Sequence, residues 1–86
     1  MDVEKDDEDR RLVHRHLSGD PSGFEGLYRR HRERIFAVLV RMLRNREDAL
    51  EATQEVFIRI HRGLDSFDAS GRFLTWAYRI ATNHAI

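Results

Sequence analysis

The sequence of 86 residues predicts an all-α fold, a compact bundle of about four helices. Apolar residues recur with the 3.6-residue period of a helix in separate stretches, and no stretch keeps the period of two that a half-buried strand needs. The breaks between these stretches are short and contain glycine, proline, asparagine or aspartate, which begin and end helices. A chain of this length holds one small core, so we expect a single folded unit.

The chain begins with an acidic segment. Residues 1–9 hold six acids and one lysine, a net charge of −5, and almost no apolar side chains. Such a segment has little apolar surface to bury, so we expect a flexible tail or a frayed first turn, followed by one domain over residues 10–86. The first helix is expected from about Asp9 to Ser18, ended by Gly19, with an apolar edge made of Leu12, Val13, His16 and Leu17.

The second helix has a clear start signal. Asp20 is a candidate N-cap, and Pro21 suits the first helical position because its φ angle is already helical. Gly23 and Gly26 are expected only to weaken the beginning of this helix, which should run to about Arg44. Its predicted apolar stripe consists of Phe24, Leu27, Tyr28, His31, Ile35, Leu39, Met42 and Leu43.

The third helix is expected to follow at once. Asn45 tolerates the left-handed conformation that would end the second helix, and Glu47 and Asp48 place acids in the next first turn. The predicted buried face consists of Ala49, Thr53, Val56, Phe57, Ile60 and Leu64. The opposite face shows Glu51, Gln54, Glu55, Arg59 and Arg62.

A loop over residues 65–71 leads to the last helix. We expect Phe67 to anchor this loop and either Asp68 or Ser70 to cap the helix that follows. One face of that helix is predicted to be buried, through Phe73, Ala77, Ile80, Ala81 and His84. A neighbouring stripe consists of Arg72, Trp76, Arg79 and Asn83.

This stripe combines groups that suit nucleic acid. Guanidinium groups hold phosphates, an indole stacks on bases, and a carboxamide bonds to base edges. The alternative is that Trp76 fills an edge of the core while the arginines are solvated. Charge favours the first interpretation: from Arg10 onward there are 14 arginines against nine acids, a net charge of +5 that the acidic start conceals.

The sequence shows no sign of export or of a membrane. Its longest apolar run, Ile35–Val40, is far too short to cross a bilayer, and no signal peptide pattern begins the chain. The absence of cysteine excludes disulfides and suits a reducing compartment. We therefore expect a cytoplasmic protein without a membrane partner.

A catalytic or metal-binding role finds little support. The chain has no glycine-rich phosphate loop, no metalloprotease motif and no nucleophile elbow. His31 and His84 fall on predicted buried stripes, where packing explains them better than metal binding. Glu51 and Glu55 lie one turn apart without a histidine partner, which favours an exposed protein-binding face over a catalytic pair. We expect no enzymatic activity, no cofactor and no metal site, although the histidines His14, His16, His31, His61 and His84 keep a metal enzyme as a remote alternative.

Four motifs occur in order along the chain: Gly19-Asp20 with Phe24-x-x-Leu27-Tyr28, Ala49-x-Glu51-x-Thr53-Gln54-Glu55-Val56-Phe57, Leu64-Asp65-x-Phe67, and Phe73-x-Thr75-Trp76-x-Tyr78-Arg79-Ile80-Ala81-x-Asn83. With these motifs the chain resembles region 2 of bacterial sigma factors of the extracytoplasmic-function (ECF) group. The resemblance covers residues 19–86. It implies the sigma-2 type of helical bundle and a non-catalytic role in transcription initiation.

The resemblance assigns the third helix to RNA polymerase. In this family the helix docks on the clamp helices, a coiled coil of the β′ subunit, through positions that correspond here to Glu51, Gln54 and Glu55. Leu50 is expected to add an apolar contact. This chain has Ala49-Leu50-Glu51 where the family usually has Ala-Glu-Asp, so we expect docking to be retained but altered in strength.

The resemblance assigns the last helix to the promoter −10 element, where it opens DNA and holds the non-template strand. Arg72 and Arg79 are expected to hold the backbone, Trp76 to wedge at the duplex edge, and Asn83 to bond near the fork. Phe73 lies where primary sigma factors carry a stacking aromatic, but its period places it on the buried face, so we interpret it as a core residue.

The resemblance also implies elements that these 86 residues do not contain. The family continues beyond this point into a loop and helix that capture a flipped base, and later into region 4, which reads the −35 element. We therefore expect a fragment. An anti-sigma factor is an expected partner, and the rival interpretation is a helical interaction module, anti-sigma-like or an adaptor, that binds protein and never DNA.

Overall fold

The computed structural model describes residues 2–68 and 70–85, with side chains from Asp7 onward. This part of the chain forms helices and connecting turns only, without a strand, which confirms the all-α prediction. The elements in order are α1 (Asp2–Leu17), α2 (Pro21–Leu43), α3 (Arg46–Gly63), the short 3-10 helix η1 (Leu64–Ser66) and α4 (Phe73–Ala85).

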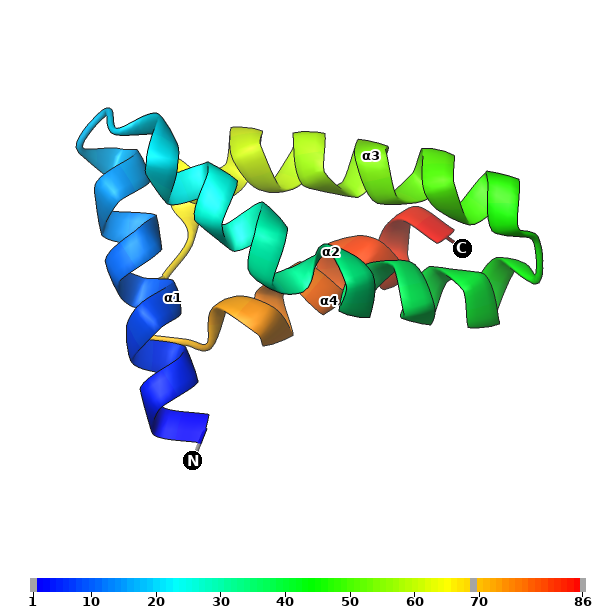
Figure 1. Ribbon diagram of the computed structural model, residues 1–86, viewed down its shortest axis with the longest axis horizontal. Coiled ribbons are helices and arrows are strands. Elements are labelled where there is room, and N and C mark those ends of the chain that lie inside the picture. The colour runs from blue at the N-terminus through cyan, green and yellow to red at the C-terminus, as the bar shows by residue number, and fades with distance from the viewer. Residues whose placement is uncertain (1, 69, 86) are drawn as a thin grey trace.

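The helices form a bundle with one long hairpin. Helices α2 and α3 run antiparallel, and α1 crosses them at one end (Figure 1). Helix α4 packs against both α2 and α3, and in Figure 1 it passes behind α2 so that its C-terminal end appears between α2 and α3. This arrangement encloses the core between the hairpin and α4, and it leaves one side of each helix facing solvent.

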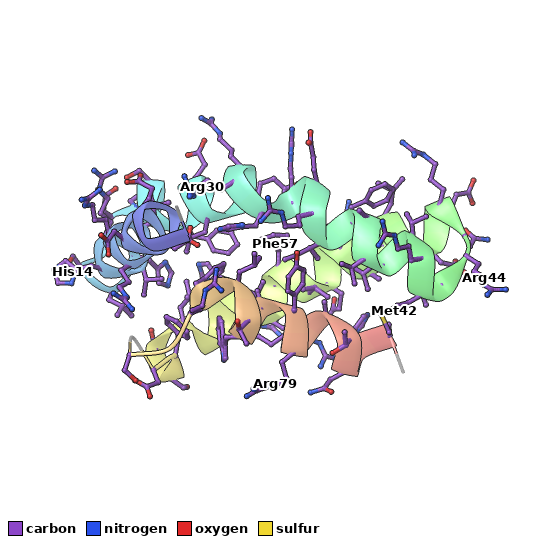
Figure 2. The ribbon with its side chains drawn as sticks, turned by 90° about the horizontal axis from the view of Figure 1, so that it is seen from below. His14, Arg30, Met42, Arg44, Phe57 and Arg79 are labelled. Carbon is purple, nitrogen blue, oxygen red and sulfur yellow. The ribbon has the colours of Figure 1, made fainter. Side chains whose placement is uncertain are left out.

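Helix α1 begins at Asp2, so the start predicted near Asp9 is wrong. Asp9 is only 2% exposed, and its Oδ1 accepts hydrogen bonds from Arg30 Nε at 3.0 Å and from His31 Nε2 at 2.8 Å. Figure 2 shows Arg30 on α2 beside α1. A buried acid needs such partners, and a search for apolar periodicity does not detect them.

Two glycines let α1 and α2 approach closely. A Cβ at Gly23 would lie 2.4 Å from both His16 N and Leu12 O, which are backbone atoms of α1. A Cβ at Gly26 would lie 2.6 Å from Leu12 Cδ2, the end of a side chain. The prediction that these glycines only weaken α2 therefore missed their main effect, which is to make room for α1.

The ends of α2 follow the predicted signals in part. The Asp20 side chain caps α2 by accepting from Ser22 N at 2.9 Å, and Pro21 is the first helical residue, as predicted. At the other end, Arg44 takes the left-handed conformation with φ 54°, and its N–H donates to Val40 O. Asn45 was expected in that conformation, but it is extended and caps α3 by accepting from Asp48 N at 3.0 Å.

The core contains the residues predicted for α3. All six members of the predicted buried face are buried. On α2 the buried residues recur every fourth position, a series that leads to the half-buried Leu43. Met42 lies about 100° from Leu43 around the helix and is 41% exposed, so its predicted burial is wrong. The largest fully enclosed side chains are Leu27, Ile35, Leu39, Val56, Ile60 and Leu64.

The segment before α4 is closed by its own hydrogen bonds. Asp68 Oδ1 accepts from Ser70 N at 3.0 Å and from Ser70 Oγ at 2.8 Å, and these bonds hold the pKa of Asp68 below its usual value. Helix α4 begins only at Phe73. Neither predicted residue caps α4, because Asp68 and Ser70 bond to each other in the turn.

Candidate interaction surfaces

The first candidate site, here called the α3 surface, consists of Leu50, Glu51, Gln54 and Glu55. The Asn45 cap fixes the start of α3, and burial of its apolar face turns these four side chains outward. Leu50 is 48% exposed, Glu51 and Gln54 are exposed, and Glu55 is half-buried. The structure thus brings all four predicted residues together on one side of one helix.

Aromatic residues of α2 extend the α3 surface. Gln54 lies at the junction of three shallow hollows, two of which are also lined by Tyr28. The third reaches α4, where His84 contributes to its wall. The Tyr28 ring lies 5.5 Å from the Arg32 guanidinium carbon, a cation-π contact. The period of α2 predicts Tyr28 on the buried stripe, but Tyr28 lies at the edge of that stripe and is half-buried.

A further exposed apolar residue belongs to this region. Ile58 is 43% exposed and lines the hollows on both sides of Gln54. Ile58 is not among the interface residues predicted from the sequence. Its position could have indicated an interface, because an isoleucine one turn after Gln54 lies on the outward face of α3 and cannot reach the core.

The second candidate site, here called the α4 surface, consists of Arg72, Trp76, Arg79 and Asn83. Arg72 directly precedes α4, and the other three project from it at the predicted spacing. Arg79 lies on the side of α4 remote from α2 (Figure 2). Arg72, Arg79 and Asn83 are exposed, and Trp76 is half-buried. Helix α4 contains no acidic residue, so this surface is cationic.

Trp76 is held by aromatic and backbone contacts. Its ring lies 5.0 Å from that of Phe67 and 5.9 Å from that of Phe73. The indole also covers Gly63 at the end of α3, where an added Cβ would lie 3.2 Å from Trp76 Cζ2. One edge of the ring nevertheless lines a hollow that Arg72 and Arg79 share. Trp76 therefore contributes to packing and remains accessible to a ligand.

Phe73 belongs to the core, as its period predicted. It is 3% exposed and packs between His31, at 5.4 Å between ring centroids, and Phe67, at 6.0 Å. Phe67 is half-buried, which confirms its predicted role as the anchor of the loop. Phe73 thus supports the α4 surface from below and has no free face to offer a base.

The histidines are dispersed or packed on other rings. His31 is buried against Asp9, and His84 is half-buried. His16 and His61 meet edge to face at 4.9 Å between ring centroids. Among the residues that the structure describes, no three His, Cys, Asp or Glu side chains are grouped as a metal ion would require. In the same residues, no helix is both long and apolar enough to span a membrane.

These features define a small helical binding domain with two surfaces of different chemistry. The α3 surface offers acids, an amide and apolar side chains, a combination typical of protein contacts. The α4 surface offers arginines, an indole and an amide, and the acid Asp68 lines the same hollow. Arginines beside an accessible indole are typical of nucleic-acid contacts.

Residues 27–86 match the family described as Sigma-70 region 2. The chain belongs to this family of RNA polymerase sigma factor domains.

Curated relatives agree with this family. The chain is 35% identical over 79 residues to RNA polymerase sigma-H factor of Pseudomonas aeruginosa, a match that covers 92% of the chain and 41% of the relative. It is 41% identical over 68 residues to the ECF sigma factor SigW of Bacillus subtilis, with 79% and 36% covered. It is 38% identical over 77 residues to the ECF sigma-E factor of Escherichia coli K12, with 90% and 40% covered. The matched part thus corresponds to about two fifths of each relative.

A solved structure has the same fold. It is described as an engineered region 2 of sigmaE in complex with GTAAAA, and it is 39% identical to this chain. The TM-score is 0.84, and the match covers 90% of this chain and 80% of that one. The sigma-2 type of bundle expected from the sequence is thereby confirmed.

Proposed function

We propose that this chain acts in transcription initiation as the part of an ECF sigma factor that binds core RNA polymerase and the promoter −10 element. The role is non-catalytic: the domain supplies binding surfaces to a polymerase that performs the chemistry. The observation that carries the proposal is the α4 surface, in which a half-buried indole lies between exposed arginines on a helix without acids.

The α4 surface would hold the separated non-template strand. Strand opening breaks base stacking, and an indole with one accessible edge can replace part of it. Arg72 and Arg79 on either side would bind phosphates, and Asn83 would bond to a base or to the backbone. The close fit of Trp76 on Gly63 and Phe67 keeps the ring in place, so little ordering is needed when DNA binds.

The α3 surface would dock on the β′ clamp helices. Glu51 and Glu55 can accept paired hydrogen bonds from arginines of a partner, and Gln54 between them can donate and accept. Glu55 lies 3.9 Å from Arg59, a distance at which a partner cation can compete for it. Leu50 and Ile58 on the same side would bury apolar area in the contact.

Pull-down by the isolated β′ clamp coiled coil tests the α3 surface. Glu51→Lys combined with Gln54→Ala should abolish capture of the chain, because the change reverses one charge and removes the central amide. Asp65→Lys, at an exposed acid of η1, is the matched control and should be captured like the wild type. Undiminished capture of the double variant would exclude this assignment.

Binding of a fork-junction DNA, part duplex and part single strand, tests the α4 surface. Arg79→Ala and Asn83→Ala should each weaken the complex several-fold, while capture by the clamp coiled coil stays unchanged. Arg10→Ala removes an exposed arginine of α1 and is the control. A chain that binds the coiled coil and shows no affinity for any DNA would instead be an interaction module.

Two further proposals concern the setting of the protein. An anti-sigma factor that covers the α3 and α4 surfaces would hold the chain inactive, and the exposed Leu50 and Ile58 give such a partner apolar area to bury. We also propose that the chain acts in the cytoplasm, where polymerase and promoter DNA are found. Both proposals would be tested by purifying the chain, as the wild type and as variants of the α3 surface, from cells together with the proteins bound to it.

A further inference from the structure

Helix α2 carries a row of arginines that neither proposed surface includes. The row consists of Arg34, Arg41 and Arg44, all exposed, and is called here the α2 arginine row. Seven residues are nearly two full turns of a helix, so Arg34 and Arg41 project to the same side, about 10 Å apart along the axis. Arg44 follows about one turn later, where α2 ends.

The row lies on the side of α2 that faces away from α3. Arg32 stacks on Tyr28 in the hollow between α2 and α3. Arg34 comes two residues later, about 200° around the helix, and so lies on the opposite side. Figure 2 shows Arg44, the last member of the row, at the turn after α2.

These arginines lack the acidic partners that other arginines have. Arg10, Arg11 and Arg29 each lie near an acid one turn away on their own helix. Within residues 7–68 and 70–85, no carboxylate lies within 4.0 Å of any member of the α2 arginine row. Glu33 is adjacent in sequence to Arg34 without pairing to a member of the row. The three positive charges are therefore available to an external anion.

The row has few apolar side chains of the kind a protein contact uses. Between Arg34 and Arg41 the residues of the same side are the exposed Ala37 and the half-buried Val38. Of the large exposed apolar residues, Leu50 and Ile58 lie on α3, Leu17 lies on α1, and Met42 follows Arg41 on α2, about 100° from it around the helix. An arginine row without acids, and with large exposed apolar residues beside it and not within it, fits a polyanion better than a protein.

Backbone conformation at Arg44 supports a role for its side chain. Arg44 has φ 54°, in the left-handed region where glycine is the favoured residue. A side chain at this position is a disadvantage for folding, so its charge is the feature that a ligand can use.

We propose that the α2 arginine row binds phosphates of the DNA backbone next to the segment held by the α4 surface. This inference rests on the proposed function. Because Arg79 lies on the side of α4 remote from α2, a strand held by the α4 surface must pass around α4 to reach the row, and α4 carries no acid that would repel it. A DNA strand carries one phosphate per 3.4 Å of helix rise, so the row spans several successive phosphates.

The salt dependence of DNA binding tests the proposal. The variant Arg34→Gln/Arg41→Gln/Arg44→Gln is compared with Arg10→Gln/Arg11→Gln/Arg29→Gln, which loses the same charge from acid-paired positions. Affinity for a fork-junction DNA is measured by fluorescence anisotropy from about 50 to 200 mM salt. Loss of three phosphate contacts lowers the slope of log K against log salt by about 2 in the row variant. The control variant should keep the wild-type slope.

A single substitution separates binding from folding. Arg44→Gly removes one charge and relieves the left-handed strain, so its melting temperature should rise while the salt slope falls by about 0.7. A variant that is more stable and binds DNA less tightly cannot owe its weaker binding to unfolding.

The possible outcomes are distinct. Equal slopes for the two triple variants, or a wild-type slope for the row variant, would overturn the proposal. A row variant that keeps the DNA slope and loses capture by the clamp coiled coil would identify the row as a protein surface, which also overturns it. Failure of the proposed function has another signature, because Arg79→Ala would then leave DNA affinity unchanged. If the wild type binds DNA without any salt dependence, both proposals are wrong.

Discussion

Replacing Gly23 by alanine tests the closest contact in the fold, the crossing of α1 and α2. The new Cβ would lie 2.4 Å from His16 N and Leu12 O, about 1 Å inside an ordinary van der Waals contact. Both atoms belong to the backbone of α1, so no rotamer change can relieve the clash. Helix α1 must move away from α2 as a unit, which loosens the packing of Leu12 and Val13 in the core.

The expected loss of stability follows from two opposing effects. Overpacking of a close-packed interior costs about 1–3 kcal/mol, and the shift of α1 places this case at the upper end. Alanine gains up to about 1 kcal/mol over glycine in a helix interior, and less in a first turn such as that of Gly23. We therefore expect Gly23→Ala to lower the free energy of unfolding by about 2 kcal/mol.

Gly26→Ala is the matched control in the same helix. Its Cβ would meet only the side chain of Leu12, which can rotate, so its gain in helix propensity should offset most of the clash. Urea unfolding followed by circular dichroism gives both values. A Gly23→Ala chain as stable as the wild type, or more stable than Gly26→Ala, would refute the proposed crossing.

Three further predictions concern single sites. Asp9→Ala should lower the free energy of unfolding by about 3 kcal/mol in urea, because it removes the buried carboxylate that accepts hydrogen bonds from Arg30 and from the buried His31; unchanged stability would show that Asp9 does not stabilise the fold. Trp76→Ala should lower the free energy of unfolding by about 2 kcal/mol and weaken the binding of fork-junction DNA, whereas Trp76→Phe should keep much of the stability. If Trp76→Ala is as stable as the wild type, the indole does not contribute to packing. Hydrogen bonds from the backbone and hydroxyl of Ser22 lower the pKa of Asp20 from its usual 3.8, so its capping contribution is complete above that pH and is lost as pH falls through the lower folded value. An NMR titration that finds the Asp20 carboxyl at or above 3.8 would contradict this cap.

The helices could be predicted because each has a strong local signal. Asp20 and Pro21 mark the start of α2, and the buried face of α3 follows a regular period. The extent of α1 could not be predicted in the same way. Its early residues are acidic, and the burial of Asp9 depends on Arg30 and His31, which are 21 and 22 residues later in the chain.

The sequence predicted which residues form the two surfaces, but not which neighbouring residues surround and hold them. Period alone placed Trp76 beside the core, and the structure adds that Gly63 and Phe67 hold it. Tertiary contacts of this kind join elements that no local pattern connects. The role of Gly23 has the same origin, because the reason for its missing side chain lies on another helix.

We propose that two different ligands bind two different surfaces of this domain. An NMR titration of the labelled chain with a single-stranded DNA of the sequence GTAAAA, which is named in the complex of the solved relative, and separately with the β′ clamp coiled coil tests this proposal. DNA should shift the resonances of Arg72, Trp76, Arg79 and Asn83, and the coiled coil those of Leu50, Glu51, Gln54 and Glu55. Shifts of the same residues by both ligands, or an α4 surface that DNA leaves unchanged, would contradict separate binding surfaces.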